Sequence, residues 1–118
     1  MLVIETIKQW ISDSERTDKL LYSDPRNPYE SIYISAKIID GKLTVTDSEC
    51  EHGPDGGWSH RIISFDEENT EKAFAFLLDR NADPFQALAD MLSYKARTAD
   101  FLDACNKRAI GFEKHIEW

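Results

Sequence analysis

A predicted β-hairpin in the middle of the chain is the feature that most constrains its fold. Apolar and polar residues alternate through 31–39 and again through 42–50, and Asp40-Gly41 separates the two runs. Alternation with a period of two is typical of a strand with one buried face. Asp-Gly is a strong signal for a two-residue type I′ turn, because that turn needs a positive φ at both positions. We therefore predict two antiparallel strands whose apolar residues face a core.

The end of the second strand conflicts with this pattern. Leu43 and Val45 occupy inward positions, and the same parity assigns Asp47 and Glu49 to that face. Unpaired carboxylates are costly in an apolar core, although a β-bulge can change the face that a strand presents. We favour the simpler interpretation that the strand leaves the core by residue 47, so that its end forms an acidic rim.

Helical and strand patterns on both sides of the hairpin supply the other elements. A helical stripe predicts a first helix over about 2–12, and 15–22 is ambiguous, with a short helical turn as one interpretation. A third strand is expected over 58–65 and a short final strand over 112–118. Capping signals and apolar spacing predict three helices between these two strands, over 64–78, 83–92 and 101–110.

The expected element order is α-β-β-β-α-α-α-β. Strands grouped together and helices grouped together indicate an α+β fold, with a mostly antiparallel sheet of three or four strands and the helices on one face. The 118 residues suffice for one ordinary core and are too few for two, so we predict a single domain over 1–118. A hydrophobic content of 42% is too high for a disordered chain.

The negative charge is concentrated in the middle third of the chain. The formal net charge is −8, and residues 40–72 carry nine acidic and three basic residues, a net of −6. This balance disfavours direct nucleic-acid binding and favours a basic protein partner. Solubility is the alternative explanation for an acidic composition. Four of the acids have a local explanation, because they fall in the first turns of a predicted helix, where they complement its dipole: Asp66, Glu67, Glu68 and Glu71.

The sequence also bears on the compartment. No apolar run reaches the length of a membrane span, and the first residues lack the pattern of a secretory signal. We therefore expect a cytoplasmic protein without membrane association. In that compartment Cys50 and Cys105 are expected to be reduced thiols, and Cys105, within a helical pattern, is expected to be a small core residue.

Candidate chemistry is sparse. Cys50, His52 and His60 lie close in sequence, but the second ligand pair typical of zinc sites is missing, so we predict no metal site. His60 shares a strand face with Trp58 and Ile62, which favours a half-buried, hydrogen-bonded histidine. No nucleophile elbow, phosphate loop or zinc-protease helix occurs, and we expect no catalytic residues, no cofactor and no enzymatic activity. A small enzyme or ligand-binding domain that uses the His52/His60 region remains the alternative.

A partner-binding surface is the stronger candidate. Four acids near the end of the hairpin have no explanation in helix capping, and Trp58 follows directly after a glycine-rich loop. Aromatic side chains among charged ones are common interface anchors, although Trp58 could equally pack into the core. The predicted partner-binding residues are Asp47, Glu49, Glu51, Asp55 and Trp58.

A small, acidic α+β chain without a catalytic motif resembles the immunity proteins of bacterial toxin systems, including contact-dependent growth inhibition. The residues that carry the resemblance are the hairpin with Asp40-Gly41, the acidic stretch Asp47–Glu51 and the terminal His115–Trp118. The resemblance implies a bacterial protein that binds and neutralises a cognate toxin domain, with a basic nuclease as the expected partner. A nuclease presents positive charge to phosphates, so an acidic protein can occupy that surface. The oligomeric state stays open.

Overall fold

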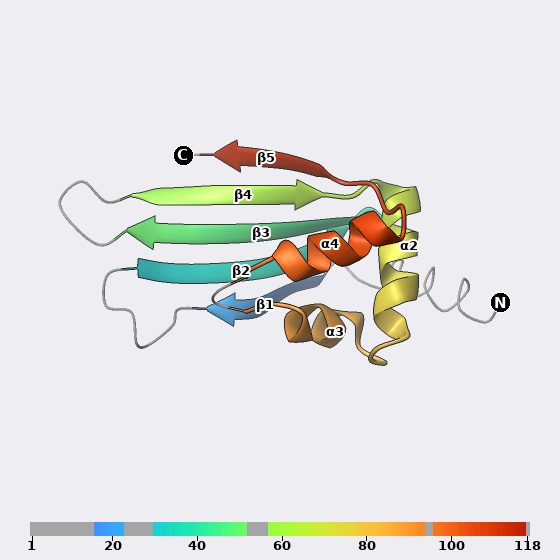
Figure 1. Ribbon diagram of the computed structural model, residues 1–118. Helices are drawn as coiled ribbons and strands as arrows, with labels where there is room; N and C mark the ends of the chain where they lie inside the picture. The colour runs from blue at the N-terminus through green and yellow to red at the C-terminus, as the bar shows by residue number, and fades with distance from the viewer. Residues whose placement is uncertain (1–15, 23–29, 52–56, 94–95, 118) are drawn as a thin grey trace.

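The computed structural model describes residues 16–22, 30–51, 57–93 and 96–117, so the helix predicted over 2–12 lies outside it. The described part forms a five-stranded sheet and three helices (Figure 1). The strands are β1 (Arg16–Tyr22), β2 (Glu30–Ile39), β3 (Lys42–Glu51), β4 (Trp58–Ser64) and β5 (Glu113–Glu117). The helices are α2 (Glu67–Leu78), α3 (Pro84–Asp90) and α4 (Ala99–Lys107). None of these three helices is long and apolar enough to cross a bilayer.

The sheet is an antiparallel meander in which the strands lie side by side in chain order. The predicted hairpin is confirmed: Asp40 and Gly41 have φ values of 54° and 76°, and the β2–β3 register runs without interruption from Ile39↔Lys42 to Glu30↔Glu51. The α+β fold with helices on one face is also confirmed.

The sheet has one strand more than the three or four that we predicted. Residues 16–22 form β1, which pairs with β2, so the interpretation of this segment as a helical turn is wrong. Strand propensity is strongly dependent on context. The pattern of residues 16–22 is ambiguous by itself, and pairing with the edge of β2 gives the segment its strand conformation.

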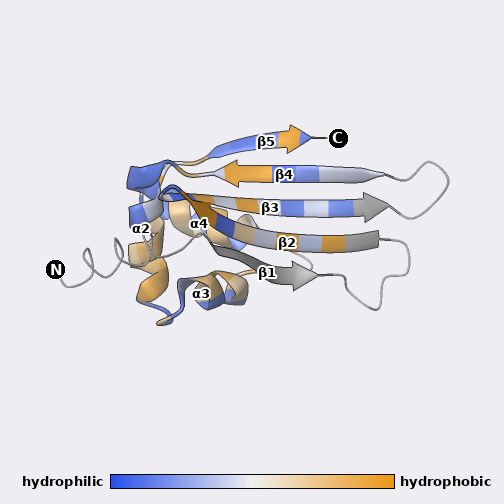
Figure 2. Cartoon of the chain, turned by 180° about the vertical axis from the view of Figure 1, so that it is seen from behind, coloured by the Kyte–Doolittle hydropathy of each residue, from blue (hydrophilic) through white to orange (hydrophobic). Residues whose placement is uncertain are grey.

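The three helices cover only part of one sheet face, toward the end that carries the Asp40-Gly41 turn (Figure 1). Seen from behind, the hydrophobic residues of β3 and β4 gather toward the helices, and the hydrophilic part of β3 lies toward the opposite end (Figure 2). The buried core joins the inward residues of the strands to the helices, and its largest fully buried side chains include Ile34, Ile38, Leu43, Ile63, Phe65, Phe74, Phe85, Leu88 and Phe101. Each such side chain contributes about 2 kcal/mol through burial.

Side-chain caps fix the start of two helices. Asp66 is the N-cap of α2 and accepts a hydrogen bond from the Asn69 backbone at 2.8 Å, while Asp83 caps α3 with Pro84 in the first turn. In the first turn of α2, Thr70 Oγ1 accepts a 2.9 Å hydrogen bond from the Leu43 backbone and so joins the helix to β3. These contacts position α2 across the end of the sheet.

The end of α4 differs from the prediction. Gly111 is expected to follow the C-terminus, but the helix ends at Lys107, and Ala109 takes the left-handed conformation with φ 55°. The backbone N–H of Ile110 then donates to the Cys105 carbonyl at 2.9 Å. This is the geometry in which glycine usually ends a helix.

Candidate functional site

Strand β3 does not leave the core at residue 47. Asp47 pairs with Ile34 and Glu49 pairs with Ile32, in the same register as the preceding residues of the hairpin. The side chain of Asp47 therefore lies on the face of the core, and only 1% of its surface is exposed. The prediction of an acidic rim is wrong for Asp47, which offers no exposed carboxylate to a partner.

Arg97 binds both carboxylates on this face. Its Nε donates to both Oδ atoms of Asp47 at 3.0 Å, and its Nη2 donates to Asp47 Oδ1 as well. Its Nη1 donates to Glu49 Oε2 at 3.1 Å. Such a fork-shaped contact with a carboxylate is a strong, charge-assisted interaction. The three groups together carry a formal charge of −1 rather than −2.

The connection between α3 and α4 presents Arg97 to the sheet. Arg97 forms an isolated β-bridge with Ser93, and its backbone N–H donates to the Ser93 carbonyl at 2.7 Å. The Ala96 backbone N–H donates to Ser93 Oγ at 2.9 Å. Arg97 itself has a φ of 57°, a left-handed conformation that costs about 1 kcal/mol for a residue with a side chain. The hydrogen bonds to Asp47 and Glu49 offset this cost.

Burial and pairing have opposite effects on the pKa of Arg97. Partial burial acts to lower this pKa, whereas the hydrogen bonds and charges of Asp47 and Glu49 act to raise it. The pairing prevails, and the pKa of Arg97 is raised above its ordinary value. The guanidinium is therefore a permanent cation over this part of the sheet.

The opposite face of β4 carries Trp58 and His60. Half of the surface of Trp58 is exposed, at 50%, so the alternative in which it packs into the core is wrong. Its ring stacks on His60, with ring centroids 6.0 Å apart and planes 4° from parallel. His60 Nδ1 shares a 2.6 Å hydrogen bond with Oγ of Ser48, its cross-strand neighbour. The prediction of a half-buried, hydrogen-bonded His60 is confirmed.

The other residues of the predicted sites are Glu51, His52 and Asp55. The backbone of Glu51 pairs with that of Glu30 at the end of the hairpin. His52 and Asp55 lie outside the described residues. Within the described part, no group of three or more His, Cys, Asp or Glu side chains is placed to hold a metal.

The Ser48–His60 contact has limited chemical capacity as it stands. A hydroxyl beside an imidazole is the starting arrangement of nucleophilic catalysis, which also needs a third group that orients the imidazole. In the described part of the chain the contact with Ser48 is the one hydrogen bond that the His60 side chain makes. The Ser48–His60 hydrogen bond therefore orients the imidazole ring on which Trp58 stacks.

Sequence reasoning missed Arg97, although the signal was present. Two carboxylates at inward positions of β3 require a cation from elsewhere, whereas the predicted departure of the strand from the core removes that requirement. Comparison of the chain with protein-family models, curated proteins and solved structures finds no match. The geometry presents two features at this end of the sheet: Trp58 on the face opposite the described helices, and the Arg97 contacts on the face that bears them.

Proposed function

We propose that this chain is an immunity protein, which binds a cognate bacterial toxin domain and blocks its activity. The observation that carries the proposal is the exposed Trp58 ring, which is held in place by His60 and Ser48. Large aromatic side chains that are already ordered contribute much of the binding free energy at interfaces, because little conformational entropy is lost. The proposed contact surface is the end of β4 that bears Trp58.

The expected partner is basic, and a nuclease domain in the cytoplasm remains the proposed class. Asp47 and Glu49 do not contribute as free acids, since Arg97 holds both. Long-range attraction would then depend on the net charge of −8 and on exposed acids elsewhere on the described surface. These include Asp66, Glu67, Glu68, Asp100, Asp103, Glu113 and Glu117. Glu51 and Asp55 stay in the proposal as sequence-based predictions.

The proposal is tested with Trp58→Ala and a matched control. Ile39→Ala also removes an exposed hydrophobic side chain, 42% exposed, at the other end of the same sheet. Each variant and the parent chain serve as bait in a bacterial lysate, and captured proteins are quantified by mass spectrometry. A basic protein bound by the parent and by Ile39→Ala, and at least tenfold less by Trp58→Ala, is expected.

The captured protein is then assayed for toxicity and nuclease activity, with and without an equimolar amount of the parent chain. Inhibition by the parent and not by Trp58→Ala would complete the case for an immunity protein. Equal capture by Trp58→Ala and Ile39→Ala would remove Trp58 from the interface. A captured protein whose activity the chain leaves unchanged would refute the immunity function.

The Ser48–His60 contact favours a second candidate, a small enzyme or ligand-binding domain centred on His60. His60→Phe separates the two candidates, because it keeps an aromatic ring under Trp58 and removes the hydrogen bond to Ser48. An immunity protein that uses Trp58 should retain its partner with His60→Phe. A site that uses the imidazole should lose its ligand or activity.

A further inference from the structure

A cavity of about 490 Å³ lies on the helix-bearing face, between strands β4 and β5 and the start of α4. Arg61 and Ile63 of β4 and Lys114 and Ile116 of β5 line one side. Their positions alternate along the strands, so these four side chains share one sheet face. The opposite wall includes Arg97 and the first turn of α4. Residues far apart in the sequence thus meet around one space.

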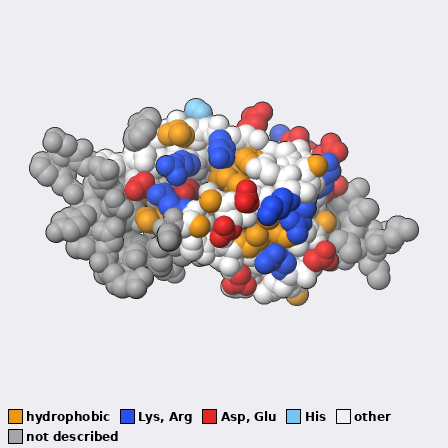
Figure 3. Space-filling model, viewed as in Figure 1, with side chains coloured by type: hydrophobic (Ala, Val, Ile, Leu, Met, Phe, Trp, Pro, Cys, Tyr) orange, Lys and Arg blue, Asp and Glu red, His pale blue; other side chains and the backbone are white. Residues whose placement is uncertain are grey.

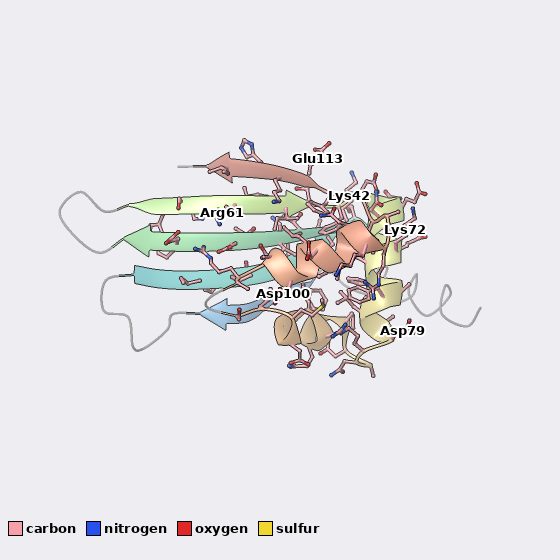
Figure 4. The ribbon with its side chains drawn as sticks, in the orientation of Figure 1. Lys42, Arg61, Lys72, Asp79, Asp100 and Glu113 are labelled. Atoms are coloured by element: carbon pink, nitrogen blue, oxygen red, sulfur yellow. The ribbon has the colours of Figure 1, made fainter. Side chains whose placement is uncertain are left out.

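The cavity carries positive charge in an acidic chain. Arg61 is the cross-strand neighbour of Asp47, but the Asp47 carboxylate is already bound to Arg97. Within the described residues, neither Arg61 nor Lys114 has an ion pair or side-chain hydrogen bond. Asp100, the acid in the first turn of α4, is not among the lining residues (Figure 4). Two exposed cations therefore remain available on this wall.

The same cavity has an apolar part. Ile63 and Leu102 are buried beneath it, and Ile116 is one of the most exposed large hydrophobic side chains, at 53%. Figure 3 shows Lys and Arg side chains beside hydrophobic ones on this face of the molecule. Small-molecule sites commonly combine an apolar lining with a few convergent polar groups, in volumes of roughly 300–1,000 Å³.

We infer that this cavity binds a small carboxylic acid with a short hydrocarbon body. The carboxylate would lie between Arg61 and Lys114, and the hydrocarbon would cover Ile63, Leu102 and Ile116. The positive end of α4 would add to the attraction for the anion. The site is independent of the proposed partner surface, because Trp58 and Arg61 lie on opposite faces of β4.

The probe is hexanoate, titrated into the ¹⁵N-labelled full chain at neutral pH and followed by amide chemical shifts. We expect saturable shifts of residues in β4, β5 and the start of α4. Hexanamide keeps the hydrocarbon without the charge, and acetate keeps the charge without the hydrocarbon. Both should bind at least about tenfold more weakly, since each lacks one of the two sets of contacts.

Variants decide whether the cavity holds the probe. Arg61→Gln/Lys114→Gln should weaken hexanoate binding at least about tenfold, because both charge-assisted contacts are lost. Lys114→Arg keeps the charge and should retain binding, and Lys37→Gln removes a cation from the opposite sheet face as the control. Unchanged hexanoate binding by the double variant, or hexanamide binding as tightly as hexanoate, would overturn the inference. So would the absence of saturable shifts at millimolar hexanoate.

Discussion

At the scale of single residues, the ion pair between Asp47 and Arg97 is the central contact of the site. The Asp47 side chain is fully buried, and Arg97 supplies its counter-charge from a residue 50 positions further along the chain. Removal of one partner of a buried pair leaves an uncompensated charge in the core. Replacement of both partners by apolar residues removes the requirement altogether.

Arg97→Met is therefore expected to lower the free energy of unfolding by about 3 kcal/mol. Asp47→Leu/Arg97→Met should recover most of that loss, because no buried carboxylate remains at position 47. Urea denaturation measures all three chains. Arg61→Met, an exposed cation on the same face, is the control and should change stability by less than about 0.5 kcal/mol. Equal losses for Arg97→Met and Arg61→Met would contradict this account.

Cys105 makes stability depend on pH at the alkaline end. Burial raises the pKa of its thiol to about 11 from an ordinary value of 9.0, against a smaller lowering by Arg108. The unfolded chain then loses this proton at a lower pH than the folded chain, so stability falls as pH rises from 9 toward 11. The loss should be on the order of 2 kcal/mol at pH 11. Cys105→Ala should lack this part of the slope in urea denaturation between pH 8 and pH 11.

At the scale of elements, contacts between chain-distant segments hold the helices on the sheet. The backbone N–H of Asn69 in α2 donates to Oδ1 of the N-cap residue Asp66, and Asn69 Oδ1 accepts from the Gly111 backbone at 2.8 Å. A side chain on Gly111 would approach Asn69 Nδ2 within 3.2 Å. The start of α2 and the entry to β5 are thus coupled through one amide side chain.

The end of α4 is an element that can be improved. Ala109 adopts a φ of 55°, where its Cβ is unfavourable and glycine is not strained. Ala109→Gly should therefore raise the free energy of unfolding by about 1 kcal/mol. Ala104→Gly, within the same helix, should lower it by a similar amount and serves as the control. Thermal and urea unfolding measure both, and a loss of stability in Ala109→Gly would contradict the assigned geometry.

The sequence predicts the elements whose signals are local. Alternation and Asp40-Gly41 predict the hairpin, and Asp83 marks the start of α3. The capping signal predicts α2 from residue 64, whereas the N-cap of this helix is Asp66. The β1 segment has no decisive pattern, because its strand state depends on pairing with β2. The parity of β3 calls for a cation, but no local signal identifies Arg97 as that cation, because only the complete fold brings it to Asp47 from 50 positions further along the chain. Parity placed both acids on the inward face, and the error lay in discarding that result.

At the scale of the whole molecule, the described part is a five-stranded meander with two outer strands and one face that the three described helices cover only in part (Figure 1). All five residues of β5 are exposed, and four of them are charged or titratable. Charged side chains on an outer strand discourage pairing with another chain. The charged side chains of β5 should therefore oppose self-association through this strand.

Glu113→Thr/Glu117→Thr should increase self-association, because it removes two charges and adds residues that favour strands. Sedimentation velocity over a range of concentrations measures the effect. Glu67→Thr/Glu68→Thr makes the same change in net charge at the exposed start of α2 and should leave self-association unchanged. If both double variants associate alike, reduced net charge rather than the strand edge is the cause.

The distance in sequence between Asp47 and Arg97 has a consequence for biosynthesis. The hairpin leaves the ribosome well before residue 97, so β2 and β3 cannot complete their buried face until the α3–α4 connection has been made. Contacts of this kind slow folding, because a long loop must close before they form. Nascent chains that end before residue 97 should therefore remain sensitive to protease, and chains that extend through α4 should be the first to resist it.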